Sequence, residues 1–130
     1  MKITRHVVVD AVLWVFAIFL VSIFVRQGAA KFSDTSGWAI AFRHWHYPTW
    51  FRMTVGAVEI AGALLLLTRR TALAGALMIA VVMLGGMATH IWWGHPEQIT
   101  SEMMPLLLSI LIAAGRRKSF IGFTGRRPST

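Results

Sequence analysis

The most informative stretch of the sequence is RMTVGAVEIAGALLLL, at residues 52–67, which is charged only at its first residue and near its middle. The middle holds a carboxylate, Glu59, and a charged group at that depth in a bilayer is costly unless it faces other helices. At helical spacing, Arg52, Gly56 and Glu59 share one face, and Gly56 leaves space beside the carboxylate. The stretch therefore predicts a membrane helix. Its carboxylate is either a polar tie to a neighbouring helix or a group that handles protons or binds a ligand.

Long apolar segments make up most of the chain on either side of this stretch. Of the 130 residues, 56% are hydrophobic and only 14% are charged. Because a helix rises about 1.5 Å per residue, about 20 apolar residues cross the hydrocarbon core of a bilayer. Four segments are near that length, at about residues 6–25, 51–67, 71–93 and 99–114. We therefore predict an all-α membrane protein, a four-transmembrane-helix bundle within one domain at residues 1–118, followed by a basic cytoplasmic tail at 119–130.

The basic residues are distributed unevenly between the two ends of this predicted bundle. Nine of the 13 fall at one end: Lys2, Arg5, Arg69, Arg70, Arg116, Arg117, Lys118, Arg126 and Arg127. The other end holds Arg26, Lys31, Arg43 and Arg52. The positive-inside rule places the nine, and with them both termini, in the cytoplasm. Because the charges flank apolar segments, we expect them to meet lipid head groups and not nucleic acid.

The loop between the first two segments has a helical pattern of its own. Trp38, Ala41, Phe42 and Trp45 recur at spacings that place them on one face of a helix. Polar residues at 33–36 can cap that helix at its start. We therefore predict an interfacial amphipathic helix at about residues 36–46, in the first extracytoplasmic loop. This helix has two alternative roles. One is an anchor or lid on the bundle, and the other is a gate for a substrate.

Small residues and a tight turn indicate how the helices meet. Ala72, Ala76 and Ala80 repeat every four residues, and small residues also recur at 56–62. Such patterns let membrane helices pack closely. The short turn at Arg69 and Arg70 predicts that the second and third segments form an antiparallel hairpin. Asp10, near the same end, is expected to be neutralised by Arg69 or Arg70 and to be structural.

The candidate functional residues gather in the predicted outer half of the membrane. Glu59 and His90 form a candidate proton relay, or else a structural hydrogen-bonded pair. Lys31, Arg52 and Trp45 complete a candidate pocket for a quinone or another polar-headed lipid. For Lys31 the alternatives are a pair with a carboxylate in this pocket, a contact to an anionic ligand, or an exposed loop lysine.

Metal and thiol chemistry are not expected from this sequence. The chain has no cysteine, so thiolate metal sites and CxxC redox chemistry are excluded. His44 and His46 are two residues apart and diverge on a helix, and only His90 lies where a membrane haem ligand would be. We therefore predict no metal site. Any redox role would need a bound quinone or a partner that carries the redox centre.

Three motifs together resemble the DoxX family of small four-helix bacterial membrane proteins. They are GAAKF at residues 28–32, RMTVGAVEIAGALLLL at 52–67, and Ala88-Thr89-His90 at the end of the third segment. The resemblance implies a multi-pass protein of the bacterial cytoplasmic (inner) membrane. It also implies a possible place beside quinone-linked oxidoreductases, since some DoxX-like proteins are subunits of such enzymes.

Three functions remain open at this point. The first is a DoxX-like membrane subunit of a redox-linked, quinone-interacting complex with a polar pocket in the outer half. The second is a non-catalytic subunit that anchors, assembles or stabilises a larger membrane complex, through other subunits or self-association. The third is an acid–base enzyme that acts on a membrane lipid through Glu59 and His90. The sequence leaves open whether the protein is an enzyme, because 130 residues without a cofactor motif make independent redox catalysis difficult.

Overall fold

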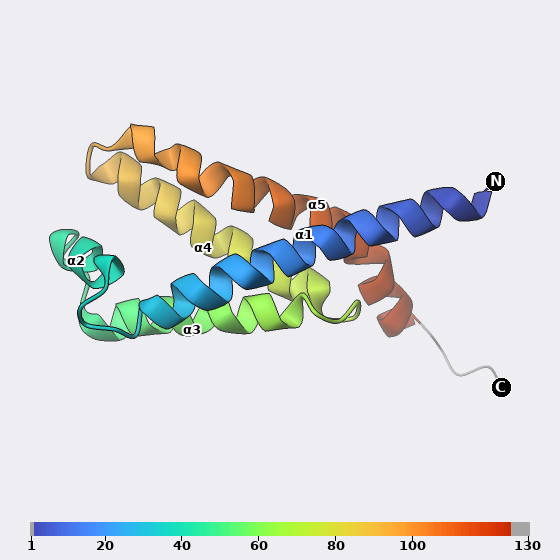
Figure 1. Cartoon of the computed structure of the whole chain (residues 1–130), viewed down its shortest axis with the longest axis horizontal. Coiled ribbons are helices and arrows are strands. Elements are labelled where there is room, and N and C mark those ends of the chain that lie inside the picture. The colour runs from blue at the N-terminus through green and yellow to red at the C-terminus, as the bar shows by residue number, and fades with distance from the viewer. Residues whose placement is uncertain (1, 126–130) are drawn as a thin grey trace.

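The computed structural model is entirely helical over the residues that it describes, which are the backbone of residues 2–125 and the side chains of residues 5–117. The elements in chain order are α1 (Lys2–Ala30), α2 (Gly37–His44), α3 (Thr49–Leu65), α4 (Ala72–Trp92), the short 3₁₀ helix η1 (Pro96–Ile99) and α5 (Thr100–Gly125). Figure 1 shows α1, α3, α4 and α5 running along the long axis, with α2 at one end beside the link between α4 and α5. We call this the α2 end. The predicted all-α architecture, including a helix in the first loop, is confirmed.

Three helical stretches in the described residues are long and apolar enough to cross a membrane. They are Arg5–Ala30, Ala72–Trp92 and Pro96–Arg117. α3 is shorter, at 17 residues. At its end, the backbone N–H groups of Leu66 and Leu67 donate to carbonyl oxygens three residues back, which tightens the last turn. The Thr71 hydroxyl then donates to the Leu65 carbonyl oxygen at 2.7 Å and closes the helix end. The structure thus gives three candidate spans and one shorter apolar helix packed among them.

The first and last helices are longer than the sequence predicted. α1 extends to Ala30, which places Lys31 directly at its end. α5 continues to Gly125, into the stretch predicted as a basic cytoplasmic tail. Residues 126–130, with Arg126 and Arg127, lie outside the described residues, as do the side chains of Lys2 and Lys118. Both helices continue beyond the apolar residues from which their bounds were predicted. Arginine and lysine favour the helix about as strongly as leucine does, so a helix can extend into a basic stretch.

Glycines set the distance between neighbouring helices. α1 and α3 cross at Gly28 and Gly56, where a Cβ on Gly56 would lie 2.7 Å from the Gly28 carbonyl oxygen. α3 and α4 cross at Gly62 and Gly75, where a Cβ on Gly75 would meet the Gly62 carbonyl oxygen. Backbones approach this closely only where no side chain intervenes. The prediction of small-residue packing on α3 is confirmed, and on α4 the closest contact is made by Gly75, the residue directly before the predicted Ala76.

The apolar core runs along the bundle and reaches the α2 end at Met83. It contains Leu20 and Phe24 of α1, Ile79 of α4 and Ile112 of α5, all almost fully buried. Many large apolar side chains face outward instead, among them Val15 of α1. A small core with an apolar exterior is expected of helices that meet lipid.

A charged cluster joins three elements at the opposite end. Asp10 of α1 binds Arg69, in the α3–α4 turn, at 2.6 Å and Arg116 of α5 at 2.7 Å. The expected Asp10–Arg69 pair is therefore present. Arg116 was not anticipated as a partner. It is buried and its guanidinium lies 5.4 Å from the centre of the Trp14 ring.

The two arginines of this cluster should differ in their effect on stability. We expect Arg116→Met to lower the melting temperature in detergent more than Arg69→Met, because Arg116 is buried and stacks on Trp14 while Arg69 is largely exposed. Thermal unfolding followed by circular dichroism measures both variants. Equal losses, or a larger loss for Arg69→Met, would contradict this ranking.

Candidate functional site

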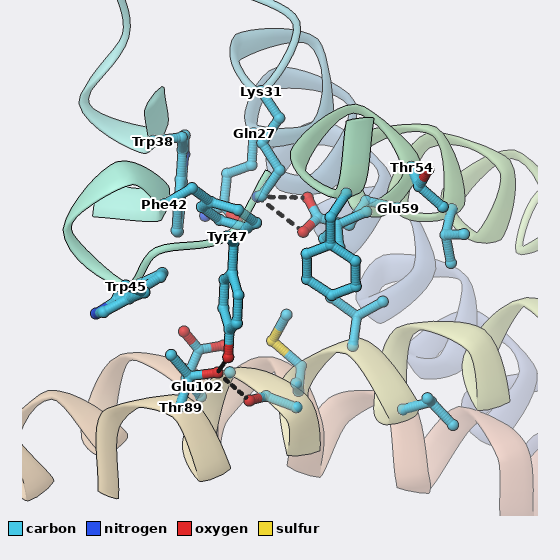
Figure 2. Close-up of a pocket in the computed structure, with 18 of the residues that line it drawn as sticks. Gln27, Lys31, Trp38, Phe42, Trp45, Tyr47, Thr54, Glu59, Thr89 and Glu102 are labelled. Carbon is cyan, nitrogen blue, oxygen red and sulfur yellow. Dashed lines mark hydrogen bonds and ion pairs between the residues drawn. The ribbon is translucent and has the colours of Figure 1, made fainter. Parts of the chain in front are cut away.

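A cavity of about 420 Å³ lies at the α2 end, between α2, α3 and α4. Most of its wall is aromatic or aliphatic. Rings come from α2, the link that follows it and the first turn of α3, and valines come from α3 and α4: Trp38, Phe42, Trp45, Tyr47, Phe51, Val55, Val58, Val81 and Val82. Three groups of polar side chains interrupt this wall (Figure 2). An apolar cavity with a few placed polar groups is the usual form of a small-molecule site.

The first polar group is a buried ion pair. The Lys31 ammonium lies 2.8 Å from Oε1 and 3.0 Å from Oε2 of Glu59, and each side chain is only 2% exposed. The Trp38 ring covers the ammonium at 3.7 Å from its centroid, a cation–π contact. Burial lowers the pKa of Lys31, whereas the charge of Glu59 and their hydrogen bond act in the opposite direction. Lys31 is therefore neither exposed nor free, and it binds the carboxylate directly.

Arg52 lies behind this pair and does not form part of the cavity wall. Its Nε donates to the Lys31 carbonyl oxygen at 2.8 Å, and its Nη2 binds Asp34 at 2.6 Å. Arg52 thus fixes the turn after α1 and so holds Lys31 in place. The predicted contact of Arg52 with a ligand does not fit this position, because its side chain is buried against the backbone of that turn.

The second polar group joins α4 to the start of α5. His90 Nε2 lies 3.7 Å from Glu102 Oε1, and both side chains are buried. The Trp45 ring stands edge-on to the imidazole at 5.4 Å between ring centroids. Glu102 fits here because Gly86 has no side chain, and a Cβ there would lie 3.1 Å from the Glu102 carboxyl carbon. His90 Nδ1 is buried and has no hydrogen-bond partner among the described side chains.

The third polar group is a hydroxyl pair that crosses the cavity. Tyr47 Oη lies 2.9 Å from Thr89 Oγ1, and Thr89 in turn donates to the Gly85 carbonyl oxygen at 2.9 Å. α2 ends with His46 in a left-handed conformation, φ 60°. Two backbone bonds, Tyr47 to Phe42 and His46 to Arg43, complete a Schellman motif that turns the chain. That turn aims the Tyr47 ring from α2 toward Thr89, between the Lys31–Glu59 pair and Glu102 (Figure 2).

Four of the five predicted site residues therefore line one cavity: Lys31, Trp45, Glu59 and His90. Glu59 and His90 belong to different pairs, with Lys31 and Glu102 as their respective partners. Glu102 and Tyr47 were missed, although Gly86, one turn before His90, marks the space that Glu102 fills. In residues 5–117 no three His, Asp or Glu side chains gather as metal ligands.

Comparison with known proteins gives the class of the chain. The model of the DoxX-like family matches residues 8–115, so the chain belongs to that family. It is also 32% identical over 80 residues to an uncharacterised protein, YdgD, of Bacillus subtilis (strain 168). That alignment covers 57% of this chain and 70% of YdgD. No solved structure matches the chain.

Proposed function

We propose that this protein is an integral membrane subunit of a redox-linked complex and that its cavity binds the head group of a quinone. In this proposal all four long helices cross the bilayer. α3 has 17 residues and is about 25 Å long, near the lower limit for a span. It packs on α1 and α4 through Gly56 and Gly62, which shelters its carboxylate from lipid.

The distribution of charge supports an orientation with the α2 end outside the cytoplasm. Arg69, Arg70, Arg116 and Arg117 lie at or near the end opposite α2, as does Arg5 at the start of α1. Basic residues near the ends of spans favour the cytoplasmic side. The cavity then opens in the outer half of the membrane of a bacterium.

The observation that carries the proposal is a buried ion pair on the wall of an aromatic cavity. A quinone head group is a flat ring with two carbonyl oxygens, and its quinol form has two hydroxyls. Indole and phenol rings at Trp38, Trp45 and Tyr47 offer faces and edges to such a ring. The Lys31 ammonium and the Tyr47 hydroxyl can donate to carbonyl oxygens. The carboxylates at Glu59 and Glu102 can accept from hydroxyls.

The chain's own contribution would be to bind the ring and to handle protons. Oxidation of a quinol releases two electrons and two protons. A carboxylate at Glu59 and a neutral imidazole at His90 can each accept one proton without leaving the cavity. The electrons would pass to a redox centre held by a partner protein, because this chain has no cysteine and its described residues form no metal site.

Quinone binding should be measurable through the tryptophans of the cavity. We expect decylubiquinone to quench the fluorescence of the purified protein saturably, and Trp45→Phe to remove a large part of that quenching. The matched control is Trp92→Phe, since Trp92 is 83% exposed and lies outside the cavity wall. Tyr47→Phe should weaken binding by about three- to tenfold, the value of one hydrogen bond.

Two results would count against the site. One is quenching that does not saturate, as expected of a quinone that only partitions into detergent. The other is saturable quenching that Trp45→Phe and Tyr47→Phe leave unchanged.

A further inference from the structure

A second cavity, of about 490 Å³, lies between α2 and the beginning of α5. Much of its wall is polar and includes Ser36, Gln98 and Ser101. It shares four residues with the first cavity: Trp38, Trp45, His90 and Glu102. The two cavities therefore adjoin at a shared wall formed by these four residues, two of which are titratable.

The two cavities open onto different surroundings. The first reaches the surface between α3 and α4, where Val81 is 68% exposed and the neighbouring residues are apolar or small. The second reaches it beside η1, where Gln98 and Ser101 are exposed. A valine-lined opening suits lipid, and an opening with an amide and a hydroxyl suits water.

Two indole rings of the shared wall contact charged or titratable groups of the first cavity. Trp38 covers Lys31, and Trp45 covers His90. The 3.7 Å between His90 Nε2 and Glu102 Oε1 is longer than a direct hydrogen bond, so the two side chains face each other without being locked together. His90 Nδ1 is buried without a hydrogen-bond partner among the described residues, and His90 lines both cavities.

We propose that Glu102 and His90 carry protons between the apolar cavity and water in the second cavity. The proposal rests on the proposed function, in which the apolar cavity is where protons are released. A proton from a ligand hydroxyl binds the Glu102 carboxylate, and the resulting carboxylic acid passes it to water on the other side. His90 can accept and release a proton at the same wall. No electron moves in these steps, and each group returns to its starting form.

Charged and titratable groups from every neighbouring element act on this pair. Lys31, at the end of α1, attracts the Glu102 carboxylate, and Glu59 of α3 neutralises Lys31 in turn. His95, the residue before η1, and Glu97, within η1, lie 3.2 Å apart, and both act on His90. The titratable or charged residues of α2 are Arg43 and His44, and neither lines the second cavity, where Trp38 of α2 and Trp45 directly after it do.

Cysteine labelling tests whether the second cavity holds water. The chain has no native cysteine, so single variants give unambiguous rates. We expect Ser101→Cys, in the second cavity, to react with a charged methanethiosulfonate at least tenfold faster than Val58→Cys, in the first. Equal rates, or faster reaction at Val58→Cys, would overturn the assignment of the second cavity to water.

Infrared spectroscopy tests the proton path itself, in protein reconstituted into liposomes. The infrared band of the Glu102 carboxyl or carboxylate group is identified as the one that is lost in Glu102→Gln. In the wild-type protein the intensity of this band should change with the pH of the aqueous phase. Ser101→Trp, which fills the second cavity, should slow that response several-fold. Met103→Trp is the control, because Met103 faces outward on the same turn of α5. A response that Ser101→Trp does not slow, or the absence of any band specific to Glu102, would overturn the proposal.

Neither readout requires a quinone, so the two proposals can fail separately. A protein that passes both tests but binds no quinone would refute the proposed function alone. A protein that binds quinone but fails both tests would refute the proton path alone.

Discussion

Glu59→Gln is expected to lower the free energy of unfolding by about 3–5 kcal/mol, the cost of leaving one partner of a buried ion pair without its counter-charge. Glu59 and Lys31 are both almost fully buried, so solvent screening does not reduce the loss. The amide still fills the space, and the Trp38 ring still covers the ammonium, but neither supplies a full negative charge. Unfolding in mixed micelles with increasing denaturing detergent measures the change.

A double variant separates the ion pair from simple loss of packing. Lys31→Met with Glu59→Gln removes both charges, and we expect it to be more stable than Glu59→Gln alone. Glu97→Gln is the matched control, because Glu97 is an exposed carboxylate near the same end and should leave stability unchanged. Stability of Glu59→Gln close to that of the wild type would show that the pair does not hold the α2 end together.

Gly75→Ala is expected to destabilise the bundle by about 1–3 kcal/mol, the usual cost of forcing atoms into a packed interface. The added methyl group would collide with the Gly62 carbonyl oxygen and also lie 2.9 Å from the Leu65 Cβ. Backbone cannot move aside as a flexible side chain can, so α3 and α4 must separate. The same micelle unfolding assay measures the loss.

Gly85→Ala on the same helix is the control for this prediction. Nothing lies within 4 Å of a Cβ built on Gly85, and alanine favours helix over glycine by up to about 1 kcal/mol. We therefore expect Gly85→Ala to be neutral or slightly stabilising. If both variants changed stability equally, helix propensity and not close packing would be the dominant effect.

Rare charged residues in apolar surroundings were the part of the site that the sequence could predict. Glu59 and His90 stand out because burying them in a membrane is costly. Lys31 was considered because it follows the first apolar segment directly, and a pair with a carboxylate was one of its expected roles. Each of these residues lines the cavity.

The partners of these residues depend on contacts that no local pattern reveals. Glu102 stands at the beginning of a predicted span, where a charged residue is ordinary and attracts no attention. Arg116 counted only toward the orientation of the helices, yet it binds Asp10, 106 positions away in the chain. Tyr47 lies directly after the predicted loop helix and was not among the candidate site residues. Its role follows from the left-handed turn at His46, which periodicity cannot show.

Helix lengths were predicted least well, for a related reason. Hydropathy locates the part of a helix that lies in lipid, and it carries no information on how far the helix continues into water. α1 and α5 both extend beyond their apolar segments, whereas α3 stops near the predicted position because threonines close its last turn.

Photo-crosslinking with an azido-substituted quinone is the measurement that tests the central claim most directly. Illumination of the purified protein, followed by mass spectrometry of its peptides, locates the bound head group. The account predicts adducts within residues 38–47 or 55–59, which line the cavity, and their loss when excess decylubiquinone competes. Adducts confined to the lipid-facing side chains of α1, such as Val15, or adducts that competition does not reduce, would contradict it.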